Sequence, residues 1–349
     1  MEQITIKDIA QICGVGVSTV SRAINNKPGI NEETKNMIMQ TIKEHNYIPN
    51  NSARNLKRSD SKNIAVLIKG INNPFFSPMI TEFEKEIKKR KYTFILQRVD
   101  ENQDEVEVAI ELEKEKRLKG IVFLGGYFSH SKEKLEKLTV PFVLSTVGVG
   151  RKMEDVEYSS VAVDDVKESY KIVDYLCKLG HNRIAIISAT NDDESIGKLR
   201  LEGYKKALEQ HEITFDQNLV YYLRSGNERY SMQSGYLAAK QLIREKADCT
   251  AIFAITDIIA LGACRAILEE GYRIPEDYSV VGYDGLDLSK YFTPSLTTIR
   301  QPVEEIALET LKVLFDLINR KGSSVHKVFE GELIVGESTK KIENKNVSI

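Results

Sequence analysis

The residues with the clearest chemistry lie near the amino terminus, within the segment DIAQICGVGVSTVSRAIN that begins at Asp8. Four polar side chains recur there at i, i+3, i+4 and i+7, namely Ser18, Ser21, Arg22 and Asn25. This spacing predicts that they share one face of a helix. Small hydroxyl groups allow a helix to approach a phosphate backbone, and an arginine can donate two hydrogen bonds to the O6 and N7 atoms of guanine. The pattern indicates a helix that reads duplex DNA in the major groove; the alternative is a polar face that is merely solvated.

Three short helices are expected to form the unit that positions this face. The first begins at Thr5, which forms a capping box with Asp8. The second begins near Val17, behind the weaker N-cap Gly16. The third, NEETKNMIMQTIKEHN, is capped by Asn31. The apolar residues of the first two helices that should face inward are Ile6, Ile9, Ala10, Cys13, Val20 and Ile24.

The composition is typical of a globular protein of about two to three domains, because 42% of the 349 residues are hydrophobic and 29% are charged. The net charge is -2, yet the first sixty residues carry eight Lys and Arg against six Asp and Glu. The first residues do not form a secretion signal, which would be a basic region followed by an apolar core. No apolar run approaches the ~20 residues that span a bilayer. We therefore expect a cytoplasmic protein that does not bind membranes. Four cysteines without a CxxC pair and five scattered histidines predict no disulfide, no metal site and no cofactor.

From Asn63 onward, short apolar runs alternate with longer amphipathic stretches. The runs expected to form strands are IAVLIK, TFILQRV, GIVFLG, PFVLST, RIAIISA, LVYYL, AIFAIT and YSVVGYD. Alternating strands and helices predict parallel sheets covered by helices, and two such sets of ~100 residues predict two lobes. Ligands of these sheets bind at the carboxyl ends of the strands, where Asn73, Phe75 and Phe76 follow the first strand. Aromatic faces suit the apolar side of a sugar or a base.

Three classes of function can be compared on these features. An enzyme finds little support, since the sequence has no GxSxG, HExxH or P-loop motif and GVGVST joins two helices. An exported solute-binding protein would need an export signal and would have no use for residues 1–58. A ligand-switched DNA-binding regulator is the one function that uses every segment.

The whole pattern resembles the LacI/GalR family of repressors. The resemblance to its headpiece runs from Ile4 to Leu56 at nearly every position, and it continues in NIAVLIKGINNPFF, YLCKLGHNRIAII, RLEGYKKAL, SVVGYDG and PSLTTIRQP. It implies an N-terminal all-α helix-turn-helix domain with a hinge helix, followed by a two-lobed α/β periplasmic-binding-protein-like domain with parallel sheets. It also implies a transcription regulator that binds a DNA operator as a homodimer and a small effector in its second domain.

The resemblance assigns roles to the DNA-facing residues one by one. Val17, Ser18 and Arg22 match the family's base-reading positions. The positions that match its phosphate contacts are Thr5, Thr19, Ser21, Asn25 and Thr34. Gly16 stands where the family usually has serine, which removes a side-chain cap. Because Val17 offers only apolar contact, for instance to a thymine methyl, Arg22 is the strongest candidate for direct readout.

The segment PNNSARNLKRSDSKN, which follows the headpiece, has two interpretations. Ala53 and Leu56 are its apolar pair at helical spacing, too little to hold an isolated helix in water, so its residues alone favour a plain flexible linker. The resemblance implies instead a hinge helix that forms when two copies meet on DNA. Ala53 would then pack against its partner, Arg54 would neutralise a phosphate and Leu56 would wedge between base steps in the minor groove.

The resemblance also implies an effector site at the strand ends. Arg200 matches an effector-contacting arginine, Tyr230 an aromatic platform and Asp284 a carboxylate that accepts ligand hydroxyls. The complete predicted effector set is Asn73, Phe76, Arg200, Tyr230, Thr256 and Asp284. Thr256 replaces an asparagine, and Thr146 an aspartate, that often hold sugar hydroxyls in the family. These two departures leave an oligosaccharide, a nucleoside or an acid as alternatives, although a carbohydrate is still the expected effector.

These features predict the domains and the assembly. The expected domains are a headpiece at 1–49, a hinge helix and linker at 50–62, an effector-binding and dimerisation domain at 63–340 and a polar tail at 341–349. The N-lobe would cover about 63–162 and 294–323 and the C-lobe about 163–293 and 324–340, with crossovers near Ala162, Pro294 and Ser324. One headpiece offers few phosphate contacts, so a two-fold dimer on a pseudo-palindrome is expected. The tail KKIENKNVSI lacks the leucine heptads of a four-chain bundle.

Overall fold

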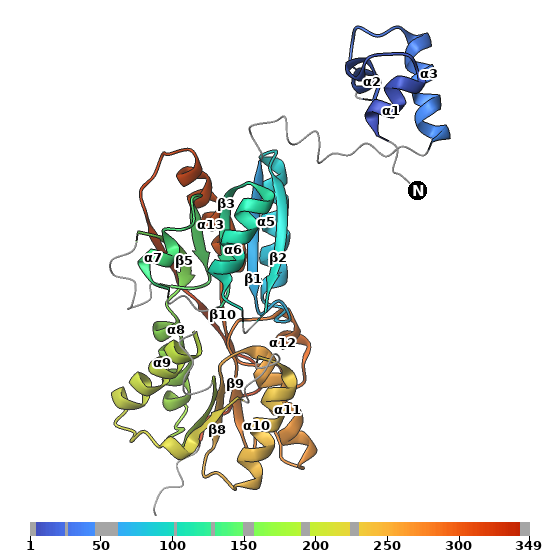
Figure 1. Cartoon of the computed structure of the whole chain (residues 1–349). Helices are drawn as coiled ribbons and strands as arrows, with labels where there is room; N and C mark the ends of the chain where they lie inside the picture. The colour runs from blue at the N-terminus through green and yellow to red at the C-terminus, as the bar shows by residue number, and fades with distance from the viewer. Residues whose placement is uncertain are drawn as a thin grey trace, which may run out of the picture. The chain divides into compact units, whose positions relative to one another are not determined.

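The structure, a computed structural model, divides the chain into two compact units, Met1–Ser61 and Lys62–Ile349. It describes residues 5–24, 27–45, 62–100, 103–126, 130–148, 157–189, 196–223 and 230–342. The described part of the first unit contains three helices, α1 Ile6–Ile12, α2 Val17–Ile24 and α3 Glu32–Glu44 (Figure 1).

The three helices of the first unit form as the capping residues and the apolar spacing predict. Thr5 and Asp8 make the capping box of α1, with the Thr5 amide donating to Asp8 Oδ2 at 2.7 Å. Asn31 caps α3 by accepting a hydrogen bond from the Thr34 amide, also at 2.7 Å. Apolar side chains from each helix meet in one small core, in which Ile9, Val20 and Ile38 are fully buried.

The second unit contains two lobes built on parallel sheets, as predicted. The N-lobe sheet has the strand order β11-β5-β4-β3-β1-β2, and all of its neighbouring strands are parallel. Its strands are β1 Asn63–Lys69, β2 Thr93–Val99, β3 Leu118–Leu124, β4 Phe142–Ser145, β5 Ser159–Val163 and β11 His326–Phe329. Its helices are α5 Phe76–Lys89, α6 Glu105–Lys116, α7 Lys132–Leu135 and α13 Val303–Ile318.

The side chains of β1 alternate between two cores, because successive residues of a strand point to opposite faces of the sheet. Ile64, Val66 and Ile68 pack into the cluster that also contains residues of α5 and α13. Ala65 and Leu67 pack into the cluster that contains residues of α6 and α7. Helices therefore cover both faces of the N-lobe sheet, which explains why the sequence of β1 is a continuous apolar run.

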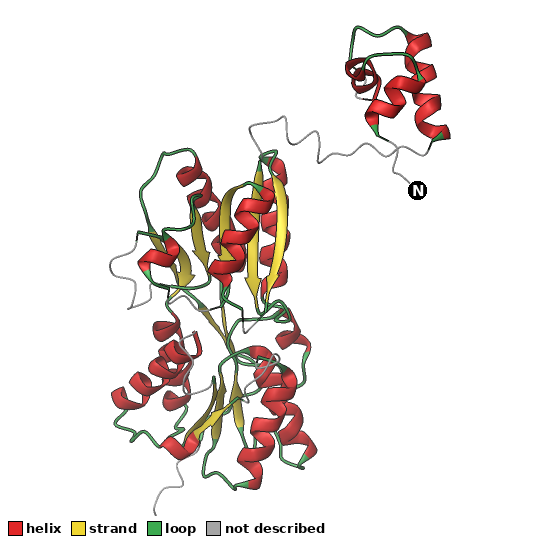
Figure 2. Ribbon diagram, in the orientation of Figure 1, coloured by secondary structure: helices red, strands yellow, loops and turns green. Residues whose placement is uncertain are grey.

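The C-lobe repeats the scheme with a smaller sheet (Figure 2). Its strand order is β7-β6-β8-β9, again parallel throughout. The strands are β6 Ile184–Ser188, β7 Val220–Tyr222, β8 Ala251–Ala254 and β9 Ser279–Val281. The helices are α8 Asp165–Lys178, α9 Ile196–Gln210, α10 Met232–Arg244, α11 Asp257–Glu269 and the short α12 Asp287–Tyr291, with a 3-10 turn, η1, at Gln217–Leu219.

Two of the three predicted crossovers between the lobes lie later in the chain than expected. The segment after Pro294 still runs beside the C-lobe, with bridges from Val281 to Thr297 and from Asp284 to Arg300. Here β10, Thr298–Arg300, pairs with β12, Glu332–Ile334, in a separate antiparallel ribbon. The chain after Ser324 is still in the N-lobe, because β11 pairs with β5 there. These strands have three or four residues each, too few for a periodic pattern to reveal their lobe.

Candidate DNA-reading helix and effector site

The helix α2 has a buried face and an exposed face, as its sequence predicts. Val20 and Ala23 are buried against the other two helices. On the other side Ser18 and Arg22 are exposed, and Val17 is 41% exposed although it is apolar. The three predicted base-reading residues therefore lie on the accessible face of the helix.

The predicted phosphate contacts lie in different settings. The hydroxyl of Thr5 donates to Asp8 Oδ2 at 2.7 Å, and this hydrogen bond lowers the pKa of Asp8. Thr19, Ser21 and Thr34 are half-buried. Asn25 and the predicted hinge residues Ala53, Arg54 and Leu56 lie outside the described residues.

In the second unit, the structure brings together three of the predicted effector residues. Asn73, in the loop between β1 and α5, donates from Nδ2 to Asp284 Oδ2 at 3.4 Å. Arg200, on α9, lies with Nη1 3.5 Å from Asp284 Oδ1. Asp284 follows β9 and is buried, with only 3% of its surface exposed. The N-lobe and the C-lobe therefore contact each other directly at this carboxylate.

Several groups of the protein contact the Arg200 guanidinium. Its Nε donates to Asp165 Oδ1 at 2.8 Å, its Nη1 donates to the carbonyl oxygen of Ile255, and its Cζ lies 3.6 Å from the centre of the Tyr283 ring. Burial by itself would lower the pKa of Arg200, but the negative charges of Asp165 and Asp284 raise it above its ordinary value. The arginine is therefore a permanent cation that holds the carboxylates in place.

Two buried aspartates share this region. Burial raises the pKa of Asp284 to about 6, against the lowering effect of Arg200. Burial, and then the nearby charge of Asp284, raise the pKa of Asp257 to about 7. Asp257 accepts hydrogen bonds from the Leu286 amide and from the hydroxyls of Ser289 and Thr298, so it ties α11 to the segments that follow β9. Asp284 also has a φ of 121°, a strained conformation for a residue with a side chain.

The other three predicted effector residues lie in three different settings. The Thr256 hydroxyl is the N-cap of α11 and accepts from the Ile259 amide at 3.3 Å. Phe76 is 8% exposed and belongs to the N-lobe core with Phe75. The Tyr230 hydroxyl lies beside Gly197, one turn before Arg200 on α9.

Residue patterns did not reveal the partners that surround these groups. Asp165 is buried and pairs with Arg200 across 35 positions of sequence. Gln301, whose Nε2 donates to Asp284 Oδ1 at 3.1 Å, follows the three-residue strand β10. Reading every strand end, including the short ones, would have identified Gln301 as a candidate.

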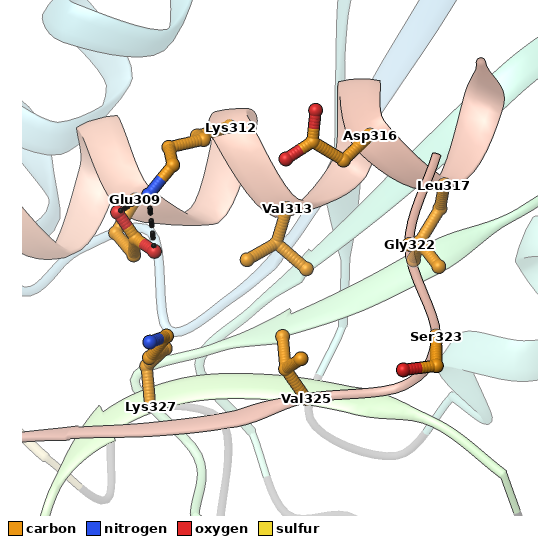
Figure 3. Close-up of a pocket in the computed structure, with 9 residues that line it drawn as sticks. All are labelled: Glu309, Lys312, Val313, Asp316, Leu317, Gly322, Ser323, Val325 and Lys327. Atoms are coloured by element: carbon orange, nitrogen blue, oxygen red, sulfur yellow. Dashed lines mark hydrogen bonds and ion pairs between the residues drawn. The ribbon is translucent and has the colours of Figure 1, made fainter. Parts of the chain in front are cut away.

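A separate pocket of about 220 Å³ lies in the N-lobe between α13 and β11 (Figure 3). Its lining residues are Glu309, Lys312, Val313, Asp316, Leu317, Gly322, Ser323, Val325 and Lys327. Lys312 is paired with Glu309 at 3.0 Å. None of the predicted effector residues lines this pocket.

The described residues contain no group of three or more His, Cys, Asp or Glu side chains that could hold a metal ion. In the same part of the chain, no helix is long and apolar enough to cross a membrane.

Comparison with known proteins identifies the family of this chain. Residues 5–50 match the model "Bacterial regulatory proteins, lacI family", and residues 173–339 match "Periplasmic binding protein-like domain". The HTH-type transcriptional regulator MalR of Clostridium butyricum is 43% identical over 95% of this chain and 98% of its own. The chain belongs to the LacI family. This membership confirms the expected resemblance, the expected fold class and the expectation that the protein is a transcription regulator and not an enzyme.

Two solved structures of transcriptional regulators are similar to this chain over nearly its whole length. A transcriptional regulator CelR–cellobiose complex is 28% identical, with a TM-score of 0.69 over 96% of this chain and 99% of its own. The lac repressor dimer bound to operator and the anti-inducer ONPF is 25% identical, with a TM-score of 0.72 over 97% and 100%. Both units of the present chain therefore have counterparts in one LacI-family protein.

Proposed function

We propose that this LacI-family regulator is an effector-responsive repressor that binds a pseudo-palindromic DNA operator as a homodimer in the cytoplasm. The observation that carries the proposal is the exposed face of α2, which presents Val17, Ser18 and Arg22 opposite a buried face. The related lac repressor is a dimer on its operator, which supports the same arrangement here. Two headpieces on one duplex would double the phosphate contacts of a single one.

Selection from random duplexes tests the DNA-binding part of the proposal. The full-length protein is incubated with a pool of random double-stranded DNA and the bound molecules are sequenced. We expect an inverted repeat whose two halves are related by a two-fold axis, because an isologous dimer presents two identical reading helices. Recovery of no common motif, or of a single unrepeated half-site, would contradict the proposal.

The effector is proposed to be a sugar that binds near Asp284, with Asn73, Phe76, Arg200, Tyr230 and Thr256 around it. A buried carboxylate accepts hydrogen bonds from ligand hydroxyls, and aromatic rings cover the apolar face of a sugar. The CelR–cellobiose complex is a relative with a sugar bound, which supports this class of ligand. A thermal-shift screen of neutral sugars, nucleosides and sugar acids tests it: a sugar should raise the melting temperature, and a response confined to nucleosides or acids would contradict the assignment.

A further inference from the structure

The side chain of Asn73 is held at both of its polar ends. Its Oδ1 accepts a hydrogen bond from the Phe75 amide at 3.0 Å, which closes a turn at the start of α5. Its Nδ2 reaches across to the other lobe and donates to Asp284 Oδ2 at 3.4 Å. The turn therefore aims the amide nitrogen at the carboxylate of the C-lobe.

The protein itself supplies the donors that Asp284 faces. Oδ1 accepts from Gln301 Nε2 at 3.1 Å and lies 3.5 Å from Arg200 Nη1, whereas Oδ2 accepts from Asn73. Gln301 and Arg200 approach from the crossover segment and from α9, and Arg200 is locked by its bond to Asp165. Asn73 is the donor that comes from the N-lobe, so its hydrogen bond to Asp284 links the two lobes.

Apolar contacts hold the two lobes together around this hydrogen bond. Ile258 of α11 and Leu286, which precedes α12, are at most 9% exposed. Both belong to the same core cluster as Phe75 and Phe76 of the N-lobe. A ligand that enters at Asp284 must therefore displace the Asn73 amide and loosen this packing.

We propose that Asn73 is an internal competitor of the effector, a latch that occupies Asp284 Oδ2 until a ligand donor replaces it. This inference rests on the proposed effector site and assigns its regulation. The replacing group must donate a hydrogen bond, because the carboxylate oxygen Oδ2 of Asp284 is an acceptor. It need not be a cation, since the Arg200 charge already faces Asp165 and Asp284. The ligand class is thus a neutral compound rich in hydroxyl groups. An acid would bring a further negative charge to buried carboxylates.

The affinity of an Asn73→Ser variant gives the test, because a competitor and a ligand contact predict opposite signs. Serine retains an oxygen that accepts from the Phe75 amide but is too short to reach Asp284. Binding of cellobiose, maltose and D-ribose is measured by calorimetry on the full-length protein. We expect the variant to bind at least one of them roughly three- to tenfold more tightly than the unmodified chain, since the lost hydrogen bond no longer reduces the competent fraction. Asn72→Ser, which changes the exposed asparagine one residue earlier, is the matched control and should bind like the unmodified chain.

Equal or weaker binding by Asn73→Ser, or no binding of these sugars by either protein, overturns the competitor role. A second variant needs no ligand: Asn73→Asp keeps the turn but places a carboxylate against Asp284. At pH 8 it should melt several degrees below Asn73→Ser because of charge repulsion, and equal melting temperatures would also overturn the latch. Neither experiment involves DNA. Failure here combined with a selected operator would therefore leave the repressor function standing.

Discussion

At the residue scale, the second unit is organised around one guanidinium and the carboxylates that surround it. Arg200 is buried and contacts Asp165 and Asp284 together, so its charge is balanced inside the protein. A buried ion pair that loses one partner leaves the other uncompensated, at a cost of about 3–5 kcal/mol. The same residues therefore determine both the stability of the lobe contact and the chemistry offered to a ligand.

Replacing Asp284 by alanine should remove the ligand response. The variant loses the carboxylate that a sugar hydroxyl would meet, whereas the reading helix α2 belongs to another unit of the chain. We expect operator affinity in the absence of ligand to be unchanged and the effect of ligand on that affinity to vanish. Anisotropy titrations of an operator duplex with and without the sugar measure both quantities, and a full ligand response would remove Asp284 from the site.

The two raised aspartate pKa values predict a dependence of stability on pH. In the unfolded chain Asp257 and Asp284 titrate near 3.8, whereas in the folded chain their pKa values are about 7 and about 6. The folded state thus binds more protons between these limits. Their contribution to stability is therefore complete below about pH 4 and is lost as the pH rises to about 7.

The substitution Asp257→Asn isolates this effect. The free energy of unfolding, measured with urea from pH 4 to pH 8, should fall less steeply with rising pH in the variant than in the unmodified chain. Asp100→Asn, at an aspartate whose side chain is 58% exposed, is the control and should leave the slope unchanged. Identical slopes for Asp257→Asn and the unmodified chain would show that the buried acid does not titrate in this range.

At the element scale, the close crossing of α10 and α11 depends on glycine. A Cβ atom at Gly262 would lie 1.9 Å from the backbone oxygen of Met232, so the two helices could not keep their present separation. We expect Gly262→Ala to lower the free energy of unfolding by about 1–3 kcal/mol, even though alanine favours helix. Gly322→Ala, where the nearest atom would be 3.7 Å away, should be nearly neutral. Urea denaturation compares the two, and equal stability would contradict the packing argument.

The strands show how much of the fold could be predicted from the sequence. The eight predicted strands are all present. Most of them are buried on both faces and are therefore continuous apolar runs, which stand out in a sequence, whereas the edge strand β2 is largely exposed or half-buried. Strand β5 was not predicted, since its sequence SSVAV begins with two serines. Those serines are buried because Ser160 hydrogen-bonds His326 at 2.9 Å and Ser159 accepts from the Val325 amide. Both partners lie 166 positions away, a distance that no local pattern encodes.

The candidate effector site could also be predicted from the sequence only in part. Asp284 and Asn73 follow strands with clear apolar patterns, so their places in the sequence indicate a strand end. The pairing of Asp165 with Arg200 joins α8 to α9, so it forms only when these helices pack in the folded chain. The position of a residue in the sequence thus showed which residues lie at the ends of strands. It did not show which of these residues are already paired with other groups of the protein.

At the scale of the whole molecule, the expected assembly is a homodimer. A single three-helix unit carries few groups that face DNA, so two copies are expected on one operator. Sedimentation equilibrium of the full-length protein should give twice the mass of the 39.5 kDa chain. A stable tetramer, or a monomer at micromolar concentration with operator present, would contradict this assembly.

The most direct test of the account is the affinity of the protein for duplex DNA from its own genomic surroundings, measured by anisotropy over a series of salt concentrations. We predict binding that weakens steeply as salt rises, because lysine and arginine contacts release counterions from the phosphates. Arg22→Ala should reduce the preference for the operator over a scrambled duplex by about 1–3 kcal/mol, since it removes the directional donor pair. Absence of salt-sensitive binding to any such duplex, with or without sugars, would contradict the central claim that α2 reads DNA.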